Sequence, residues 1–377
     1  MKALILALMF TASLVYSQTR EIEDYIMSPE HDFYGYNYLN GPNAGRGNTG
    51  IAGENDISGV MLNPASLVIK SKYSAGLQYS YKTTNEISYS FEMSNGGYAY
   101  DLKHIAPALQ GGFGMNVTKT LGAAILYSNP GSIRFVYKNF GGGVNDGELT
   151  EDYSIHTVIL PVTYDLGKIK LGIAPSFSFY RAKMTGVSTI TQPDGTGEVN
   201  SYFDRFNIQA GMKVNPVNNF SIGLTFTPGF IADLKSDEDP YPATFKVISK
   251  QPFKLSAGIE YIGAKQKFRL SADYNFQQTS KLNGYLDKHD FNIGGEYSVN
   301  KSLALRAGFF TIFDIRDFED EDVSFPGKAG DFSQYFLTCG LSYKINNFDL
   351  SASLMDSHVS MGLIKLTIIN AGFTYGF

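Results

Sequence analysis

The sequence predicts an all-β fold, namely a transmembrane antiparallel β-barrel of the outer-membrane type with about fourteen strands and an N-terminal plug in its lumen. Three observations lead to this prediction. Apolar and polar residues alternate in many segments, short links between these segments alternate with long ones, and the chain ends in a strand-like segment with a terminal aromatic residue, Phe377.

The alternation has the period of a β-strand with one apolar face. It is clearest in 253–261 (FKLSAGIEY) and 268–276 (FRLSADYNF), and it recurs in 73–82, 206–214, 220–226, 291–297, 303–309 and 348–354. Successive strand residues point to opposite faces, so each segment has one apolar face, often with aromatic residues at its ends. This layout is typical of a lipid-facing band between two aromatic girdles. A soluble β-sandwich alternates too, but its strands are usually about 5–6 residues long, whereas these segments reach about 9–12.

The links between the segments alternate between short and long. Short links are expected near 118–119, 165–168, 215–219, 263–266, 300–301 and 346–347, and long polar links near 181–201, 228–251, 277–288, 313–332 and 355–362. Short periplasmic turns and long external loops are the pattern of outer-membrane barrels. Counting back from Phe377 gives strands at 364–377, 347–355, 333–344, 302–312, 289–298, 266–276, 252–262, 219–228, 202–214, 168–180, 154–164, 120–137, 108–117 and 72–93. We therefore expect fourteen strands, with sixteen as the alternative because the early region can be divided differently.

The N-terminus has the pattern of a secretory signal peptide. Lys2 supplies a positive charge, residues 3–16 are apolar, and Ser17 is a small residue at the expected cleavage point. The apolar run is shorter than the roughly 20 residues of a membrane-spanning helix. We therefore expect residues 1–17 to be removed and the mature chain to begin at Gln18 in an exported protein.

Composition excludes several other classes of protein. The net charge is −5 and the mean hydropathy is −0.12, which fits neither a nucleic-acid-binding protein nor an inner-membrane protein. Cys339 is the single cysteine, so an internal disulfide is excluded. We expect a closed sheet in lipid to provide the stability instead.

Residues 18–66 differ from the rest of the chain because they lack the alternation. The part from 41 to 66 is rich in Gly and Asn and contains a G-x-G-x-x-G pattern at Gly45, Gly47 and Gly50. That pattern binds a pyrophosphate only between a strand and a helix of a βαβ unit, and neither is expected here. We therefore predict a plug or hatch at 18–66, followed by the barrel at 67–377.

This segment resembles the N-terminal region of the FadL/TodX family of outer-membrane transporters. The resemblance lies in Ala44–Gly47, Gly53–Asp56 and Asn63–Leu67, which lead into the first strand, with a second similarity in Ser128–Ile133. It implies a fourteen-stranded barrel with a hatch. The hatch-motif residues that it implies are Gly45, Gly47, Gly53, Asn63, Pro64 and Ala65.

The resemblance also implies a function, the passage of hydrophobic small molecules such as fatty acids or aromatic hydrocarbons. Such proteins capture ligand at the external loops, hold it in an apolar pocket, and release it when the hatch moves, in some members sideways through the wall. A short helix is expected at 101–110, with Ile105, Ala108 and Leu109 as capture residues. The chain is shorter than many members, so reduced external loops are expected.

A second resemblance supplies the alternative. The Asn63–Ala65 entry and the segment Ser132–Phe135 are similar to barrel proteins of the type IX secretion system of Bacteroidota. These proteins act as shuttles or scaffolds for other proteins. In that case the partners would be secretion machinery and exported cargo.

The sequence does not favour an enzyme, a metal site or a cofactor. The five histidines are scattered, and His289 and Asp290 are strand neighbours that would point to opposite faces. The acidic runs 237–239 and 317–322 lack the spacing of a Ca²⁺ loop, so solvated loops are favoured. The expected partners are a hydrophobic small molecule, outer-membrane lipid and lipopolysaccharide, and the barrel assembly machinery, with no nucleic acid and a monomeric barrel.

Charged residues on the polar strand faces are expected to point into the lumen, because a charge facing lipid near the midplane costs about 2–4 kcal/mol. They are Lys213, Glu260, Arg269, Asp273, Glu296, Arg306 and Asp349. They could line a water-filled pore or form a network that holds the hatch. Their mixed signs favour the network.

Overall fold

The computed structural model describes most of the chain from residue 41 onward. The described residues are 41–84, 88–93, 96–106, 108–129, 132–138, 148–187, 196–231, 235–236, 250–263, 266–281, 285–317, 333–359 and 365–377. The predicted signal peptide at 1–17 and the first part of the predicted hatch, 18–40, lie outside them.

The described residues form fourteen strands, four of which consist of two segments each. These four are β1 (Tyr73–Thr84) with β2 (Ser88–Met93), β3 (Gly96–Ala106) with β4 (Ala108–Asn116), β5 (Leu121–Asn129) with β6 (Ser132–Lys138), and β7 (Glu148–Ile159) with β8 (Val162–Asp165). The other ten are β9 (Ile169–Val187), β10 (Thr196–Val217), β11 (Phe220–Thr227), β15 (Lys254–Ile262), β16 (Phe268–Gln277), β17 (Lys288–Ser298), β18 (Leu303–Ile312), β19 (Gln334–Ile345), β20 (Phe348–Asp356) and β21 (Leu366–Gly376).

Several short elements complete the described structure. They are the pieces β12 (Phe230–Ile231), β13 (Lys235–Ser236) and β14 (Lys250–Gln251) and the 3₁₀ helices η2 (Gly41–Arg46), η3 (Pro64–Ser66) and η5 (Thr279–Lys281). Across the described ranges, no helix combines the length and the apolar character needed to cross a membrane.

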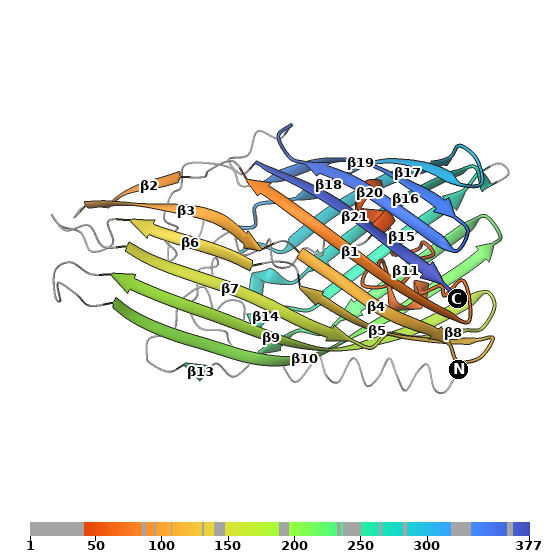
Figure 1. Ribbon diagram of the computed structural model, residues 1–377, viewed down its shortest axis with the longest axis horizontal. Coiled ribbons are helices and arrows are strands. Elements are labelled where there is room, and N and C mark those ends of the chain that lie inside the picture. The colour runs from red at the N-terminus through yellow and green to blue at the C-terminus, as the bar shows by residue number, and fades with distance from the viewer. Residues whose placement is uncertain are drawn as a thin grey trace.

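The strands pair antiparallel with their sequence neighbours and the sheet closes on itself (Figure 1). Closure is made by β1 and β21, which pair from Ser74 with Gly376 to Thr84 with Leu366. A closed barrel leaves no unpaired sheet edge, which satisfies the backbone polar groups in lipid. The prediction of fourteen strands is therefore confirmed, and the alternative of sixteen is wrong.

The six predicted short links lie at one end of the barrel, which we call the short-turn end, and both the start of β1 and Phe377 are there. Tyr73 N donates to Phe377 O at 3.0 Å, and Phe377 N donates to Tyr73 O at 3.0 Å. The two-residue turn between β19 and β20 contains Asn346 with φ 53°, a left-handed conformation that Asn tolerates. The other strand ends form the long-connection end. The predicted short turns are confirmed.

Two sequence predictions are corrected by the strands at the long-connection end. Residues 101–110 are not a short helix, because they belong to β3 and β4, which pair with β6 and β5. Residues 181–201 are not mainly a loop, because β9 and β10 pair continuously out to Val187 and Thr196. The local pattern of these polar residues predicts a loop. Pairing between two long neighbouring strands nevertheless stabilises the extended conformation there.

The two faces of the wall differ as predicted. Outward side chains are apolar, and Leu270 and Ile293 are 60% and 59% exposed on the isolated chain. Many inward side chains are small or polar, and the charged residues Lys213, Glu260 and Asp273 are buried inside the barrel. A smaller number of inward side chains are large and apolar, among them Phe310 and Phe336. The outward band fits a lipid environment.

Candidate functional site

The space enclosed by the strands contains the chain segment that precedes β1. We call residues 41–69 the inner segment. It begins with η2, makes several turns, and includes η3, and Figure 1 shows η2 surrounded by strands. Most of its residues are buried, among them Ala44, Ala65 and Thr49 with no exposed surface. Its position is set by three kinds of contact, which are close backbone packing, buried polar bonds and an apolar cluster.

The backbone packing depends on inward glycines of the wall. We call these the wall glycines, and they are Gly172, Gly211, Gly223, Gly258, Gly294, Gly308 and Gly340, on β9, β10, β11, β15, β17, β18 and β19. A Cβ on Gly172 would lie 2.3 Å from Ala65 N, and one on Gly223 would lie 2.1 Å from Ile51 O. Such distances leave no room for any side chain. The wall glycines therefore allow the inner segment to lie directly on the strands.

Two of the hatch-motif glycines, Gly45 and Gly47, lie in the inner segment and pack against the wall glycines. Gly47 has φ 63°, and a Cβ added to it would lie 2.3 Å from Ile293 O. A Cβ on the facing Gly308 would lie 2.2 Å from Gly47 N. Gly45 faces Gly340 in the same way, with a Cβ 2.7 Å from the Gly340 Cα. Both residues thus serve backbone-to-backbone contact, which gives the G-x-G-x-x-G pattern a role other than phosphate binding.

A buried ion pair joins the inner segment to β15. Arg46 Nη1 lies 3.1 Å from Glu260 Oε2, and both side chains are almost inaccessible, at 3% and 1%. Arg46 Nη2 also donates to Asn43 Oδ1 at 2.9 Å. Gly53 packs on this pair, because a Cβ there would lie 3.0 Å from Glu260 Oε2.

The ion pair continues along the wall toward β18. Arg269 Nη1 lies 3.7 Å from Glu260 Oε1, and Arg269 Nε lies 3.6 Å from Glu296 Oε1. Arg306 Nη2 then approaches Glu296 Oε2 at 2.7 Å. Alternating signs along this chain compensate the buried charges. The predicted network of inward charges is thus present, and it includes a residue of the inner segment.

Two wall residues bind the backbone of the inner segment. Asp273 Oδ2 on β16 accepts hydrogen bonds from Gly50 N at 2.7 Å and Ile51 N at 3.1 Å. Thr338 Oγ1 on β19 accepts from Gly47 N at 2.8 Å and lies 3.1 Å from Gly45 O. These contacts satisfy backbone groups that are buried away from water.

The Asn63–Ala65 stretch connects the inner segment to the wall through hydrogen bonds. Asn63 Oδ1 accepts from Ala65 N at 2.9 Å and caps η3, while Asn63 Nδ2 donates to Ile51 O at 2.7 Å and to Met212 O at 3.2 Å. Pro64 O accepts a hydrogen bond from Thr163 on β8. One carboxamide thus joins a cap, a turn of the inner segment and the wall.

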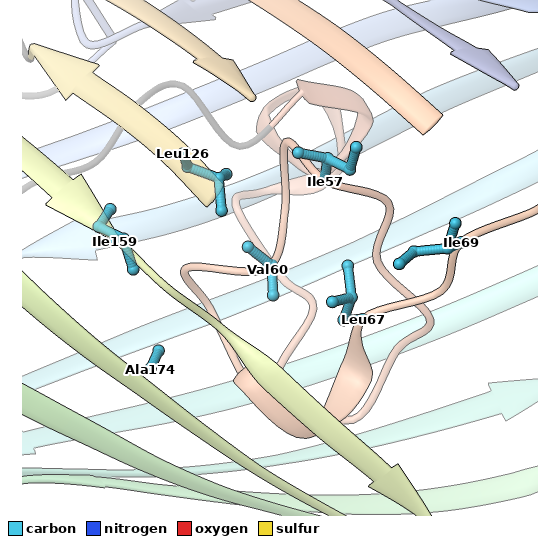
Figure 2. Close-up of a cluster of buried hydrophobic side chains, with 7 residues drawn as sticks. All are labelled: Ile57, Val60, Leu67, Ile69, Leu126, Ile159 and Ala174. Atoms are coloured by element: carbon cyan, nitrogen blue, oxygen red, sulfur yellow. The ribbon is translucent and has the colours of Figure 1, made fainter. Parts of the chain in front are cut away.

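An apolar cluster lies between the inner segment and one side of the barrel (Figure 2). Its members are Ile57, Val60, Leu67 and Ile69 of the inner segment with Leu126, Ile159 and Ala174 of β5, β7 and β9. Met61 and Ala124 pack against it. The cluster lies where the first strands are divided into segments, because β5 ends three residues after Leu126 and β7 ends at Ile159.

A cavity of 240 Å³ lies between the inner segment and the wall. Ile51, Met61 and Leu62 line it from the inner segment, and β9, β10, β11, β15, β16 and β17 contribute the other side. Most of the wall side chains in this lining are polar or charged. The pocket that the sequence resemblance implies is apolar, so this polarity is a difference from the expectation.

A second hollow of 530 Å³ lies at the short-turn end of the barrel. Leu67, Ile69 and Lys72 line it, together with the turn 117–120 and the adjoining parts of β8 and β9. The inner segment separates the two spaces, with Ile51 and Met61 on one side and Leu67 on the other.

The predicted capture residues do not form one cluster. Ala108 is buried with 1% of its surface exposed, whereas its neighbour Leu109 is 37% exposed. Strand alternation places these two side chains on opposite faces of the wall. Ile105 lies in β3, one residue before the end of this segment, and β4 begins at Ala108. Their proposed capture role stays a prediction.

The acidic and histidine residues that the structure describes include no candidate metal site. No group of three or more His, Cys, Asp or Glu residues in this part of the chain could hold a metal ion. His289 Nδ1 contacts the Tyr274 hydroxyl at 2.6 Å, while Asp290 is buried on the other face. The acidic run 237–239 and most of 317–322 lie outside the described residues.

Sequence reasoning missed the wall glycines and the buried amides. The wall glycines lie at inward positions in the middle of alternating segments, and all except Gly294 occur singly. Three pairs of them face each other across neighbouring strands, among them Gly223 with Gly258. A search for glycine at the inward mid-strand position of successive segments would have found them. Asn43 Nδ2 donates to Asn55 Oδ1 at 2.7 Å, a contact with no local sequence signal.

Comparison with solved structures identifies the architecture. The fold is similar to that of CymD, a monoaromatic hydrocarbon channel, with a TM-score of 0.58, 15% identity, and 90% and 98% of the two chains covered. It is similar to the P. putida toluene transporter TodX, with a TM-score of 0.59, 12% identity, and 90% and 99% covered. No protein-family model and no curated protein matches the sequence.

The fold thus defines the chain as an outer-membrane β-barrel. More narrowly, its fourteen-stranded architecture is that of the TodX and CymD channels over nearly the full length of both chains.

Proposed function

We propose that the chain transports hydrophobic small molecules, of the hydrocarbon or fatty-acid class, across the outer membrane, and that it is not an enzyme. The observation that carries the proposal is the combination of the channel fold with a segment inside the barrel. TodX and CymD are described as a toluene transporter and a monoaromatic hydrocarbon channel. An apolar solute gains no free energy when it enters an aqueous pore. It does gain free energy when it leaves water and contacts apolar side chains.

The inner segment acts as a plug in this proposal. It separates the cavity from the hollow at the short-turn end, which faces the periplasm in barrels with short periplasmic turns. Ligand therefore leaves the cavity when the inner segment shifts or when the wall opens beside it. Buried polar contacts hold the segment on the side of β15 to β19. On the side of β5 to β9 the apolar cluster holds it, together with the hydrogen bond from Thr163 to Pro64 O.

The apolar side offers the easier route for a hydrophobic ligand. Contacts in the apolar cluster have no direction and re-form after a small shift, whereas the ion pair of Arg46 with Glu260 would leave two buried charges apart. The divided strands β5/β6 and β7/β8 lie on that side. We therefore place the outlet beside Leu126 and Ile159.

The direct test measures uptake of labelled toluene and labelled oleate into proteoliposomes that contain the purified barrel. Uptake above that of protein-free liposomes supports the proposal. A barrel that transports neither compound, and that co-purifies with protein-secretion components instead, contradicts it and favours the secretion-associated alternative. Mass spectrometry of the molecules that co-purify with the barrel gives an independent identification of bound ligand.

A reversible cross-link tests the movement of the plug. Thr374 Oγ1 on β21 donates to Asp56 Oδ2 at 2.9 Å, so D56C with T374C in a C339S background brings two thiols together. We expect oxidation to stop uptake and reduction to restore it. The matched control is either single cysteine variant, whose uptake should not respond to oxidation. Full uptake by a barrel shown to be cross-linked would contradict a displaced plug on that side.

A further inference from the structure

The cavity has a polar wall of regular construction. Thr227, Lys254, Gln277 and Lys288 occupy paired positions on the four successive strands β11, β15, β16 and β17. All four line the cavity, and Gln209 lines it from β10. Cross-strand neighbours on one face of a sheet lie about 4.5–5.5 Å apart, so these side chains form a continuous polar row.

Carboxamide groups dominate the lining. They belong to Asn48, Asn207, Gln209, Asn275, Gln277 and Asn292. Some are used within the protein, since Asn275 Nδ2 donates to Asn292 Oδ1 at 3.1 Å and Asn292 Nδ2 donates to Gly47 O at 2.9 Å. In the part of the chain that the structure describes, the carboxamides of Gln209 and Gln277 make no hydrogen bond. Two donor-and-acceptor groups therefore line the cavity from β10 and β16, with β11 and β15 between them.

The charged groups around the cavity have both signs. Arg205, Lys254 and Lys288 are cationic, and Asp273 and Asp290 are anionic. Asp273 is used by the backbone of the inner segment, and Asp290 lies 3.8 Å from Lys288 Nζ and accepts from Phe313 N at 3.3 Å. The lining thus carries three cationic and two anionic side chains, which provide both donors and acceptors.

The opposite side of the cavity is apolar. Ile51, Met61 and Leu62 of the inner segment and Ile159 of β7 contribute aliphatic or thioether surface. The cavity volume of 240 Å³ leaves room for the polar end of a ligand and the carbons next to it. A long chain would have to extend out of this cavity.

Each class of ligand can be compared with this lining. A hydrocarbon would leave the carboxamides of Gln209 and Gln277 without partners, which is costly once water is displaced. A carboxylate only accepts hydrogen bonds, so it would leave the oxygens of both carboxamides unmatched. A hydroxyl or an amide donates and accepts, and matches both atoms of each carboxamide.

We propose that this cavity binds small amphiphiles whose polar end carries hydroxyl or amide groups, in preference to plain hydrocarbons and carboxylates. The polar end lies against Gln209 and Gln277, and the apolar end packs on Met61, Leu62 and Ile159. This inference rests on the proposed transport function, and it replaces the hydrocarbon or fatty-acid class at this cavity with small amphiphiles that carry a neutral polar group.

The test uses the full barrel in lipid nanodiscs and three probes, hexyl β-D-glucoside, hexanoate and toluene. Equilibrium dialysis measures binding, and empty nanodiscs correct for partition into lipid. We expect saturable binding of hexyl glucoside that is stronger than that of the other two probes. Q209L combined with Q277L should weaken glucoside binding by about tenfold, because two neutral hydrogen bonds are lost. Toluene should bind more tightly to this variant, because it no longer leaves two carboxamides without partners.

The matched control is Q278L, which makes the same chemical change one residue beyond β16 and outside the cavity lining. It should bind all three probes like the parent protein. Heat-modifiability on gels reports whether each barrel is folded, and the two single variants replace the double variant if it is not. Glucoside binding no greater than in empty nanodiscs, tighter binding of hexanoate or toluene, or equal affinity in Q209L/Q277L would overturn the proposal.

The outcomes separate this proposal from the transport function. If toluene crosses proteoliposomes but hexyl glucoside does not bind, transport stands and the polar substrate class is wrong. If hexyl glucoside binds through Gln209 and Gln277 but no probe crosses, the site stands and transport is wrong.

Discussion

Arg46 and Glu260 are 214 residues apart in the sequence, and their side chains meet at 3.1 Å inside the barrel with almost no exposed surface. Arg46 comes from the segment that precedes the barrel, and Glu260 comes from the eighth of its fourteen strands. The pair therefore joins the inner segment to the wall opposite the closing strands β1 and β21. Asn43, Arg269 and Ser271 surround it with further polar contacts.

Replacing Glu260 with Gln should loosen the inner segment without preventing barrel assembly. Removal of one partner of a buried ion pair leaves the other charge uncompensated, at a cost of about 3–5 kcal/mol. We expect E260Q to raise the ionic conductance of single barrels in planar bilayers. The control is D204N, because the pair of Asp204 with Arg181 is largely exposed and contributes little. A conductance of E260Q equal to that of the parent would contradict the role of the Arg46–Glu260 ion pair in holding the inner segment in place.

Adjacent glycines on β17 provide a test of the wall packing. A Cβ on Gly294 would lie 2.2 Å from Arg46 O, whereas the neighbouring Gly295 would bring its Cβ no closer than 3.3 Å to Leu270. Overpacking typically costs about 1–3 kcal/mol, so G294A should displace the inner segment and G295A should not. Trypsin digestion of the folded barrel, read by mass spectrometry, should show cleavage after Arg46 in G294A alone. Equal protection of Arg46 from trypsin in both variants would contradict the proposed packing of the inner segment on the wall glycines.

Asn63 should hold the second half of the inner segment in place. N63A removes the cap on Ala65 and the donor to Ile51 O and Met212 O, and an unsatisfied buried acceptor costs about 1–3 kcal/mol. Hydrogen exchange should become faster at residues 50–66, while the strands keep their protection. The comparison variant is N300A, which alters a capping Asn in an exposed turn between β17 and β18. Unchanged hydrogen exchange in N63A would show that the position of residues 50–66 does not depend on the Asn63 side chain.

The outward band predicts a cost that depends on depth in the membrane. Ile293 is 59% exposed near the middle of β17, and Tyr297 is near its short-turn end. A lysine facing lipid costs about 2–4 kcal/mol at the midplane and about 0–1 kcal/mol near the interface. Folding free energies in lipid vesicles should therefore fall more in I293K than in Y297K. A similar loss in both variants would mean that β17 spans the membrane at a different depth.

Most of the barrel could be predicted from the sequence because a strand in lipid repeats a simple pattern. The alternation at 253–261 and 268–276 predicts β15 and β16 nearly to their ends, and the links at 263–266 and 346–347 predict two of the short turns. The segment 101–110 could not be assigned correctly. Its apolar residues lack a clear period, and its strands are stabilised by pairing with β5 and β6.

The contents of the lumen depended on the tertiary structure. Local sequence shows that Arg46, Glu260 and Asp273 are polar and that Gly223 and Gly308 are small, but it does not show which of them meet. Those contacts join residues more than 150 positions apart, and closure of the sheet decides them. For the same reason the sequence could place Gln209 and Gln277 on a strand, and only the closed barrel shows that they face one cavity. The fold class thus follows from a short-range period, whereas the site follows from long-range register.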